Sequence, residues 1–375
     1  MNTHFSTADS SNHKQLNSGG SKTMKKNFRC ICSIFFVTIL GFAFAGAALA
    51  APKYQWRIAS ETIAGSVADL YAQELARLLK EKSNGDIQLE IYHSGSLGTP
   101  TEMFELTLAG AIEFCLTGPS QSSSIVPENQ ILGLQFLFSD NHLANRDFLA
   151  ESKALNEMLN RKYEAKGITA LSYFAEGAMF WTANKPIHKP EDFNGVKIRV
   201  MPSELLVETY KAYGANPTPL SFTELYSALQ LNIVEAQENA PVTTQEMKFM
   251  DVQKYLIGSR HNVYVMQHLA NVNFMESLPE DIRQIVLESV DEVRPYIHDV
   301  QVKLNQERLQ MMVDNFKPGQ DYYDLTSEER NVFKEEAKKA DETYYKLSRD
   351  PEFAKNLLAT FRSEMDEIEK RHIKQ

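Results

Sequence analysis

The sequence has very few cysteines. Three occur among the 375 residues, and two of them, Cys30 and Cys32, lie in an N-terminal segment that we expect to be removed. Cys115 is then the single thiol of the mature chain, so an internal disulfide is excluded. The apolar neighbours of Cys115 indicate a buried structural residue rather than a nucleophile. The hydrophobic core must therefore hold this chain together.

Motifs for catalysis, nucleotide binding and metal binding are also missing. There is no G-x-S-x-G, Walker loop, dinucleotide fingerprint or H-E-x-x-H. His261 and His268 share one apolar run, but a spacing of seven residues is not compact enough for a pair of metal ligands. No two of the many acidic residues stand out as a catalytic pair. We therefore expect no metal, no cofactor and no catalytic residues.

Positive charge is in deficit. The 39 Lys and Arg are outnumbered by 49 Asp and Glu, which gives a formal net charge of −10. Nucleic-acid binding needs a basic surface, so we expect no nucleic-acid partner. Hydrophobic residues make up 43%, enough for two domains or one large one. An acidic protein that binds an anion must concentrate positive charge locally.

The one long hydrophobic run lies near the N-terminus. A basic segment, residues 24–29, precedes the apolar residues 31–44, and Ala48-Leu49-Ala50 forms a small-residue cleavage site. This order predicts a signal peptide that begins at Met24 and is cleaved after Ala50, with residues 1–23 as an upstream extension. The apolar run is too short for a permanent span, although an uncleaved anchor is the alternative. Residues 1–50 carry five Lys or Arg and one Asp, so the mature charge is −14.

The start of the mature chain alternates between strand and helix patterns. Residues 54–60, 86–92 and 111–117 have strand patterns. Two helical patterns separate them: one opens with a capping box at Ser66 and ends at Gly85, and the other spans 100–108. Alternation of this kind predicts a parallel sheet built from βαβ units. Ligands in such sheets bind beyond the carboxyl ends of the strands. Our first candidates for a ligand site are therefore the segments that follow these strands, residues 60–62, 93–95 and 118–121, and among them Glu61, Ser120 and Gln121.

Further along, the pattern indicates two lobes joined by crossing strands. A helix is expected over 141–162, and strands over 168–175 and 179–183 flank Gly177, a plausible crossing point. A third apolar run, 261–272, is expected to cross back. A capping pattern at Ser277 predicts a helix that runs from there to about Phe316, long enough to contact two domains.

The segment 194–241 carries the clearest chemical signal. Lys197 and Arg199 alternate with apolar residues in a predicted strand, so both point to one face. A guanidinium at a strand end suits a carboxylate, because it is planar, charged and bidentate. An exposed arginine or an internal ion pair is the alternative.

Several spaced blocks in this segment resemble the solute-binding proteins of TRAP transporters, the DctP-type family. The blocks are G-V-K-I-R-V-M at 195–201, Y-G-A-N-P-T-P-L at 213–220, E-L-Y-S-A-L-Q at 224–230 and V-E-A-Q-E-N-A-P at 234–241. A further block, Y-H-S-G-S-L-G at 92–98, extends the resemblance over most of the mature chain. Blocks in a fixed order are more specific than one short motif.

The resemblance implies an α/β fold of the periplasmic binding protein type. Two α/β lobes enclose a ligand cleft, and the long C-terminal helix braces both. We expect lobe I to contain residues 51–176 and 263–304, and lobe II to contain residues 177–262 and 305–375.

The resemblance also assigns ligand-binding residues. Arg199 matches the arginine that pairs with the ligand carboxylate, Asn239 matches a hydrogen-bond donor to the same group, and Phe222 matches an apolar wall. The alternatives are a strand-end turn residue for Asn239 and ordinary core packing for Phe222.

One position departs from the family pattern. Many members carry a second arginine where this chain has Met179, and strand alternation puts Trp181 on the same face. We therefore expect a ligand with one anionic group and an apolar or hydroxylated body, rather than a dicarboxylate.

The implied function is transport. A periplasmic protein of this family captures a small organic acid by lobe closure and delivers it to a TRAP-type membrane permease, which an ion gradient drives. Three alternatives remain at this point: the binding protein of an ATP-driven importer, a ligand-reporting partner of a membrane sensor and an exported enzyme.

Overall fold

Two β-sheets organise residues 51–373, the part of the chain that the computed structural model describes. The predicted signal peptide lies outside the described residues. The first sheet has the strand order β2-β1-β3-β10-β4, and the second has the order β11-β9-β5-β8-β6-β7. The strands are β1 (Tyr54–Ser60), β2 (Ile87–Tyr92), β3 (Phe114–Thr117), β4 (Ile168–Ala178), β5 (Phe180–Ala183), β6 (Lys197–Val200), β7 (Asn216–Pro219), β8 (Ala236–Asn239), β9 (Tyr255–Gly258), β10 (Val263–Asn271) and β11 (Asp321–Asp324).

Helices cover the sheets, so the predicted α/β class is confirmed. The α-helices are α1 (Val67–Lys82), α2 (Pro100–Leu108), α3 (His142–Glu151), α4 (Asn160–Glu164), α5 (Glu204–Ala212), α6 (Leu225–Gln230), α7 (Pro241–Glu246), α8 (Val272–Ser277), α9 (Glu280–Asp314), α10 (Ser327–Ala337), α11 (Ala340–Leu347) and α12 (Pro351–Ile373). Shorter 3-10 helices include η1 (Pro119–Ser122), η2 (Pro127–Gly133), η4 (Pro190–Phe193), η5 (Phe222–Glu224) and η6 (Phe249–Asp251), and η3 (Ala154–Leu159) is a π-helix. None of the helices described is long and apolar enough to cross a membrane.

Lobe I is built on the first sheet as the βαβ pattern predicts. Strands β1, β2 and β3 run parallel, and β10 pairs antiparallel with both β3 and β4. The Ser66 side chain caps α1 by accepting from the N–H of Asp69, as the sequence indicated. The apolar stripe of α1, with Tyr71 and Leu75, packs into a core with Ile58 and Phe114.

Lobe II is built on the second sheet around an aromatic core. Trp181 and Phe193 pack with Tyr210, Tyr213 and Phe333, and each ring is at most 2% exposed. These rings come from β5, η4, α5 and α10, so the core joins distant parts of the chain.

Two segments connect the sheets. Strand β4 of the first sheet runs into β5 of the second, and β9 of the second leads to β10 of the first. Met179 and residues 259–262 lie at these crossings, where the N–H of Met179 donates to the carbonyl oxygen of Asn262 at 2.7 Å. Such paired crossings suit a hinge between two lobes.

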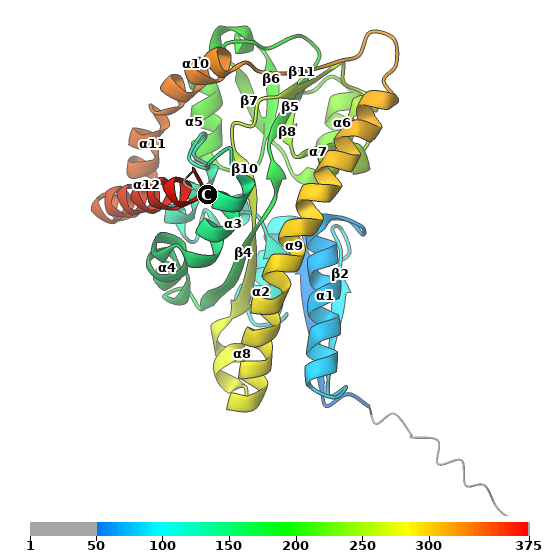
Figure 1. The fold of residues 1–375 in the computed structure, drawn as a ribbon, viewed down its shortest axis with the longest axis vertical. Coiled ribbons are helices and arrows are strands. Elements are labelled where there is room, and N and C mark those ends of the chain that lie inside the picture. Colours follow the sequence, from blue (N-terminus) through cyan, green and yellow to red (C-terminus); the bar gives the residue numbers. More distant parts are fainter. Residues whose placement is uncertain (1–50, 374–375) are drawn as a thin grey trace, which may run out of the picture. The chain divides into compact units, whose positions relative to one another are not determined.

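Helix α9 contacts both lobes, as predicted. Its N-terminal half packs into the core around α1, and Met312 near its C-terminus packs with Phe180 and Leu256 of lobe II. Figure 1 shows α9 passing beside α1 and then beside α7. The predicted cap at Ser277 is wrong: the Ser277 hydroxyl donates to the carbonyl of Phe274 at the end of α8, and Pro279 precedes α9.

The predicted division of the C-terminal part needs correction. Helix α10 packs in lobe II through Phe333, but α11 and α12 bury Tyr344 and Phe361 in the lobe I core beside Phe148. Residues 340–368 therefore belong with lobe I, although the sequence assigned them to lobe II. The reason is that the apolar stripe of α12 matches an apolar surface of α3 and η3.

The sequence predicted a single helix over residues 141–162. The structure has three helices there, α3, η3 and α4.

Candidate ligand-binding site

A polar cavity lies where strand ends of the two sheets meet. The empty space within its walls, open solvent included, is about 380 Å³, and about 30 Å³ of it is wide enough for the centre of a water molecule. Lobe I contributes Glu61, Thr62, Pro100, Gln121, Glu176 and Tyr264, and lobe II contributes Arg199, Met201, Phe222, Asn239 and Thr243. Several of these residues end or follow strands, as expected for ligand sites of open α/β sheets. Five of the predicted residues, Glu61, Gln121, Arg199, Phe222 and Asn239, are thus brought together.

Arg199 is the one arginine among the lining residues. It lies on β6 and is only 2% exposed. Its Nε donates to the carbonyl oxygen of Leu220 at 3.1 Å, and among residues 51–373 the guanidinium forms no ion pair. Burial lowers its pKa to about 10, despite the neighbouring Glu238 and Glu61, so the side chain stays charged at pH 7. A buried cation of this kind is suited to an anionic ligand.

Glu61 is a buried carboxyl group in the same cavity. The hydroxyl of Tyr264 donates to its Oε1 at 2.5 Å, and Thr117 Oγ1 donates to its Oε2 at 3.0 Å. Burial raises the pKa of Glu61, and these two hydrogen bonds act against that rise. The cavity therefore combines one guanidinium with the acidic side chains Glu61 and Glu176.

Polar amides and an aromatic ring complete the wall. Asn239 ends β8, and its Nδ2 donates to Gln237 Oε1 at 2.5 Å. Gln121 accepts from Thr101 Oγ1 at 2.8 Å. Phe222 begins η5 and packs against Leu225, so it is part of the lobe II core as well as a lining residue.

Three predicted residues do not line the cavity. The Ser120 hydroxyl accepts from Gln121 Nε2 at 3.1 Å. Met179 is 2% exposed at the β4–β5 crossing, and Trp181 is fully buried, with its Nε1 donating to Tyr210 Oη at 2.8 Å. The shared face inferred for Met179 and Trp181 therefore does not form a cavity wall, because the indole ring belongs to the aromatic core of lobe II.

Other lining residues were missed by the sequence reasoning. Glu176 and Tyr264 lie in strands that were read only as crossing segments. The sequence identified only Gly177, next to Glu176, as a plausible crossing point between the lobes. Met201, which follows Arg199, and Thr243 of α7 carry no motif of their own.

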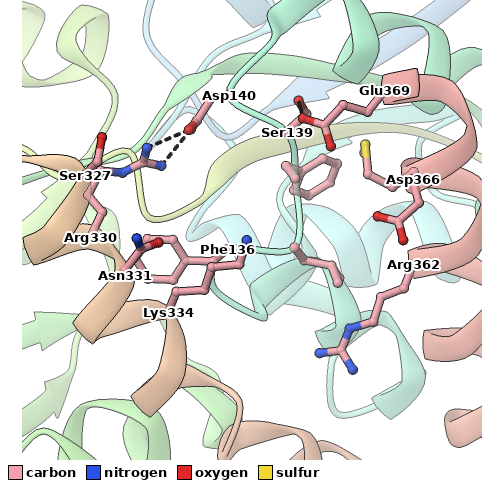
Figure 2. Close-up of a pocket in the computed structure, with 13 residues that line it drawn as sticks. Phe136, Ser139, Asp140, Ser327, Arg330, Asn331, Lys334, Arg362, Asp366 and Glu369 are labelled. Atoms are coloured by element: carbon pink, nitrogen blue, oxygen red, sulfur yellow. Dashed lines mark hydrogen bonds and ion pairs between the residues drawn. The ribbon is translucent and has the colours of Figure 1, made fainter. Parts of the chain in front are cut away.

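A larger hollow, about 1060 Å³, lies between the loop at 136–140, α10 and α12 (Figure 2). Its two arginines are already paired. Arg330 makes two 2.6 Å hydrogen bonds to Asp140, and Arg362 pairs with Asp341 at 2.7 and 2.9 Å. A hollow whose guanidinium groups are neutralised by the protein is a weaker candidate for an anion site than the Arg199 cavity.

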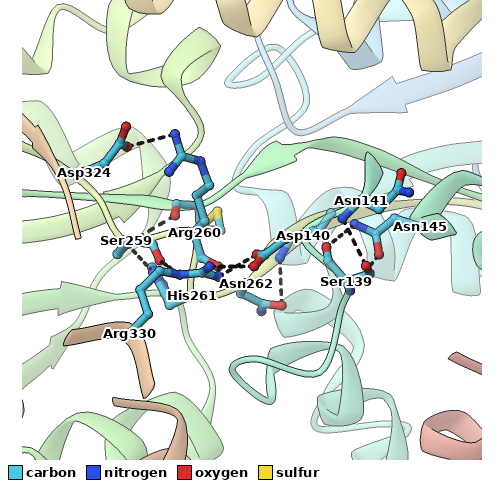
Figure 3. Close-up of polar contacts among 12 residues, drawn as sticks. Ser139, Asp140, Asn141, Asn145, Ser259, Arg260, His261, Asn262, Asp324 and Arg330 are labelled. Atoms are coloured by element: carbon cyan, nitrogen blue, oxygen red, sulfur yellow. Dashed lines mark hydrogen bonds and ion pairs between the residues drawn. The ribbon is translucent and has the colours of Figure 1, made fainter. Parts of the chain in front are cut away.

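Arg330 of lobe II also connects the crossing segment, residues 259–262, to lobe I (Figure 3). Besides Asp140 of lobe I, it donates to the carbonyl oxygens of Ser259 and Arg260 at 3.0 and 3.1 Å. The next residue, His261, contacts Glu238 Oε2 through Nε2 at 2.8 Å. The crossing segment is thus connected to β8, whose last residue lines the cavity.

Residues 51–373 contain neither a cluster of metal-ligating side chains nor an exposed thiol. No group of three or more His, Cys, Asp or Glu is arranged to hold a metal ion there. Cys115 is buried, and burial raises the pKa of its thiol to about 12.

Comparisons with known proteins agree with this architecture. Residues 58–347 match the model of the family described as "Bacterial extracellular solute-binding protein, family 7" (DctP). The chain is 32% identical to the ectoine-binding periplasmic protein TeaA of Halomonas elongata, over 88% of this chain and 95% of TeaA. It is 33% identical to the ectoine/5-hydroxyectoine-binding periplasmic protein UehA of Ruegeria pomeroyi, over 84% and 91% of the two chains.

Solved structures give the same picture. The structure of the ectoine-binding protein of the TeaABC TRAP transporter superposes with a TM-score of 0.80 at 31% identity, over 83% of this chain and 99% of that one. A TRAP periplasmic solute-binding protein from Desulfovibrio salexigens with bound orotic acid gives 0.79 at 28% identity, over 84% and 99%. These relatives are binding proteins rather than enzymes. The chain belongs to family 7 of the bacterial extracellular solute-binding proteins, and it is a solute-binding protein of the TRAP-transporter type.

Proposed function

We propose that the protein captures a small organic acid in the Arg199 cavity and delivers it to the membrane permease of a TRAP transporter. Uptake is then driven by an ion gradient rather than by ATP. The observation that carries the proposal is the buried guanidinium of Arg199, which has no anionic partner among the described residues. The relatives TeaA and UehA, which are named for ectoine, are solute-binding proteins of this kind.

The solute carboxylate pairs with Arg199, and the amide of Asn239 lies within the same cavity to donate to it. Phe222 provides an apolar wall. A site with one lining arginine favours a solute with one carboxylate over a dicarboxylate.

Capture involves closure of the two lobes. The crossings β4–β5 and β9–β10 are the hinge, and the ligand favours the closed state because it contacts side chains of both lobes there. Closure removes water from the ion pair and strengthens it.

The protein acts outside the cytoplasm as a binding protein without catalysis. Its relatives are periplasmic. The signal peptide begins at Met24 and is cleaved after Ala50, which N-terminal sequencing of the exported protein tests.

Isothermal titration calorimetry of Arg199→Ala tests the central assignment. The variant should bind the solute about 2–5 kcal/mol more weakly, because the carboxylate is left buried without a partner. This corresponds to roughly 30-fold to several-thousand-fold in Kd. Lys197→Ala is the matched control: Lys197 lies two residues earlier on β6, is exposed and is not a lining residue, so its affinity should match the wild type. Equal affinity of Arg199→Ala and the wild type refutes the assignment.

A further inference from the structure

Glu176 lies at an irregularity of β4 where that strand reaches the cavity. In the pairing of β4 with β10, Gly177 lies opposite Tyr264 and Ala175 lies opposite Val265. Glu176 is therefore the extra residue of a β-bulge. Bulges change the direction of a side chain and are frequent beside functional sites. Here the bulged residue is a lining residue of the Arg199 cavity.

The bulge is fixed by α9. Asn305 Nδ2 donates to the carbonyl oxygen of Glu176 at 2.6 Å, and Asn305 Oδ1 accepts from the N–H of Val242 at 3.1 Å. Gly177 has a φ of +150°, and a Cβ at this position would lie 2.6 Å from Asn305 Nδ2. The contact thus requires glycine next to Glu176. The backbone at Glu176 is therefore fixed by α9 through Asn305 and by β10 through the strand pairing.

The Glu176 carboxyl group is buried. A hydrogen bond from the backbone of Ala68 acts on it, but one of its two oxygens has no partner among the described residues. The residue is 2% exposed, and its Oε1 has no hydrogen-bond partner among residues 51–373. An unpaired buried carboxyl oxygen is costly, because it has lost its hydration without gaining a donor. Its position in the cavity wall indicates that the donor comes from the solute.

The charges of the cavity favour a solute that carries both signs. Arg199 is suited to a carboxylate, while Glu61 and Glu176 line the same space with carboxyl groups. Both oxygens of Glu61 already accept hydrogen bonds, from Tyr264 and Thr117. Glu176 is the lining acid that has a carboxyl oxygen without a donor among the described residues. A simple anion would satisfy Arg199 alone.

We propose that Glu176 accepts an N–H donor from a cationic group of the solute, so that the site selects compact zwitterions with one carboxylate and one cationic nitrogen group. This inference rests on the proposed function, because it places the solute carboxylate on Arg199. Glu176 is then a residue that determines specificity.

Proton release accompanies binding of such a solute. Burial raises the pKa of Glu176 to about 8, and the charges of Glu61 and Glu246 act in the same direction. The free protein therefore holds this carboxyl group mostly protonated at pH 7. A cation bound against Glu176 lowers its pKa, so a proton leaves and the affinity rises as the pH increases from about 6 to 8.

The other groups near Glu176 determine which control is needed. The charged or titratable side chains that face this region are Glu61 of the segment after β1, Asp69 of α1, Arg199 of β6, Glu246 of α7, Tyr264 of β10 and Arg308 of α9. Burial raises the pKa of Glu246 to about 7, so this group also titrates in the same range. Glu246 is not a lining residue, which makes Glu246→Gln the matched control.

The test compares two ring-shaped carboxylates by calorimetry. Ectoine carries one carboxylate and a cyclic amidinium, and orotate carries one carboxylate on a ring of the same size without a cationic group. The wild type should bind ectoine more tightly than orotate and release most of a proton with ectoine at pH 7, measured in buffers with different ionisation heats. Glu176→Gln should weaken ectoine binding roughly 10- to 100-fold and remove the proton release. Glu246→Gln should keep the ectoine affinity and still release a proton with ectoine, but a smaller fraction of one, because Glu246 no longer raises the pKa of Glu176.

Each outcome separates this inference from the proposed function. If the wild type binds orotate at least as tightly as ectoine, or binds ectoine with no dependence on pH between 6 and 8, the role of Glu176 is refuted. Equal ectoine affinity of Glu176→Gln and the wild type refutes it as well. In each of these cases the proposed function stands if Arg199→Ala still loses the acid that the wild type binds. The pH series needs no variant, so it decides the matter even if Glu176→Gln does not fold.

Discussion

Arg199 stands in a protein environment that does not fully compensate its charge. Its pKa is lowered to about 10 by burial, even though Glu61 and Glu238 oppose this shift. A lowered pKa of a cation means that the folded state holds the charge at a cost in free energy, here a few kcal/mol at neutral pH. When the solute carboxylate binds, it pairs with the guanidinium and removes this cost. Relief of the unpaired charge therefore contributes to the binding free energy.

The cost of the unpaired charge can be tested by replacing Arg199 with an apolar side chain of similar length and measuring the free energy of unfolding. Arg199→Met should raise the free energy of unfolding of the unliganded protein by about 1–2 kcal/mol at pH 7, because a buried charge without a partner is exchanged for an apolar group. Denaturant unfolding, with Lys197→Met as the control, measures the change. A loss of stability would mean that the guanidinium serves an internal ion pair, which was the structural alternative for this residue.

Helix α12 shows how elements distant in sequence decide the lobe architecture. The ring of Phe361 lies 4.2 Å from that of Phe148 and 5.3 Å from that of Phe138, measured between ring centroids. Glu364 of the same helix accepts from the hydroxyl of Ser152 at 2.7 Å and from the N–H of Lys153 at 3.1 Å. The C-terminal helix therefore closes the core of lobe I, while α10, separated from it only by α11, belongs to lobe II.

Truncation of Phe361 tests this assignment. Phe361→Ala should cost about 3–5 kcal/mol in unfolding free energy, because the ring is fully buried. Hydrogen exchange should speed up in α3 and η3 and stay unchanged in α10 and β6. Phe353→Ala, on the same helix with a partly buried ring, should cost clearly less. Faster exchange in α10 rather than α3 would return α12 to lobe II.

Local chemistry allowed most elements to be predicted, and its limits are visible at particular residues. Ser66 caps α1 as the sequence predicted, and Thr326, which likewise stands three residues before an acidic residue, caps α10. Ser277 has similar spacing, but Pro279 follows it and the hydroxyl turns back to Phe274. The apolar stripe of α12 was evident in the sequence, but a stripe does not specify its partner.

The candidate site was predictable in the same uneven way. The motif resemblance placed Arg199, Asn239 and Phe222, and the strand-end rule placed Glu61 and Gln121, all of which line one cavity. Trp181 and Met179 were misplaced because strand alternation was extended through a crossing where the chain changes sheets. The bulge that directs Glu176 into the cavity depends on pairing with β10, 87 residues away, and has no local signature.

The whole molecule is an acidic protein with one buried cation in its cavity wall. The formal net charge of residues 51–375 is −14, which would repel a small anion at long range, so capture depends on the local field of Arg199 and on closure of the lobes around it. Two crossing segments, α9 and the Arg330–Asp140 pair connect the lobes. This arrangement suits a protein whose two lobes close around a solute.

Native mass spectrometry of the exported protein tests the central claim most directly. Wild type and Arg199→Ala are purified from the same host, and the molecules released on denaturation are identified. The account predicts one small solute with a carboxylate per wild-type chain and none on Arg199→Ala, while Lys197→Ala retains it. The same solute on Arg199→Ala, or a wild type that carries no molecule and gains no thermal stability from any organic acid, would contradict the account.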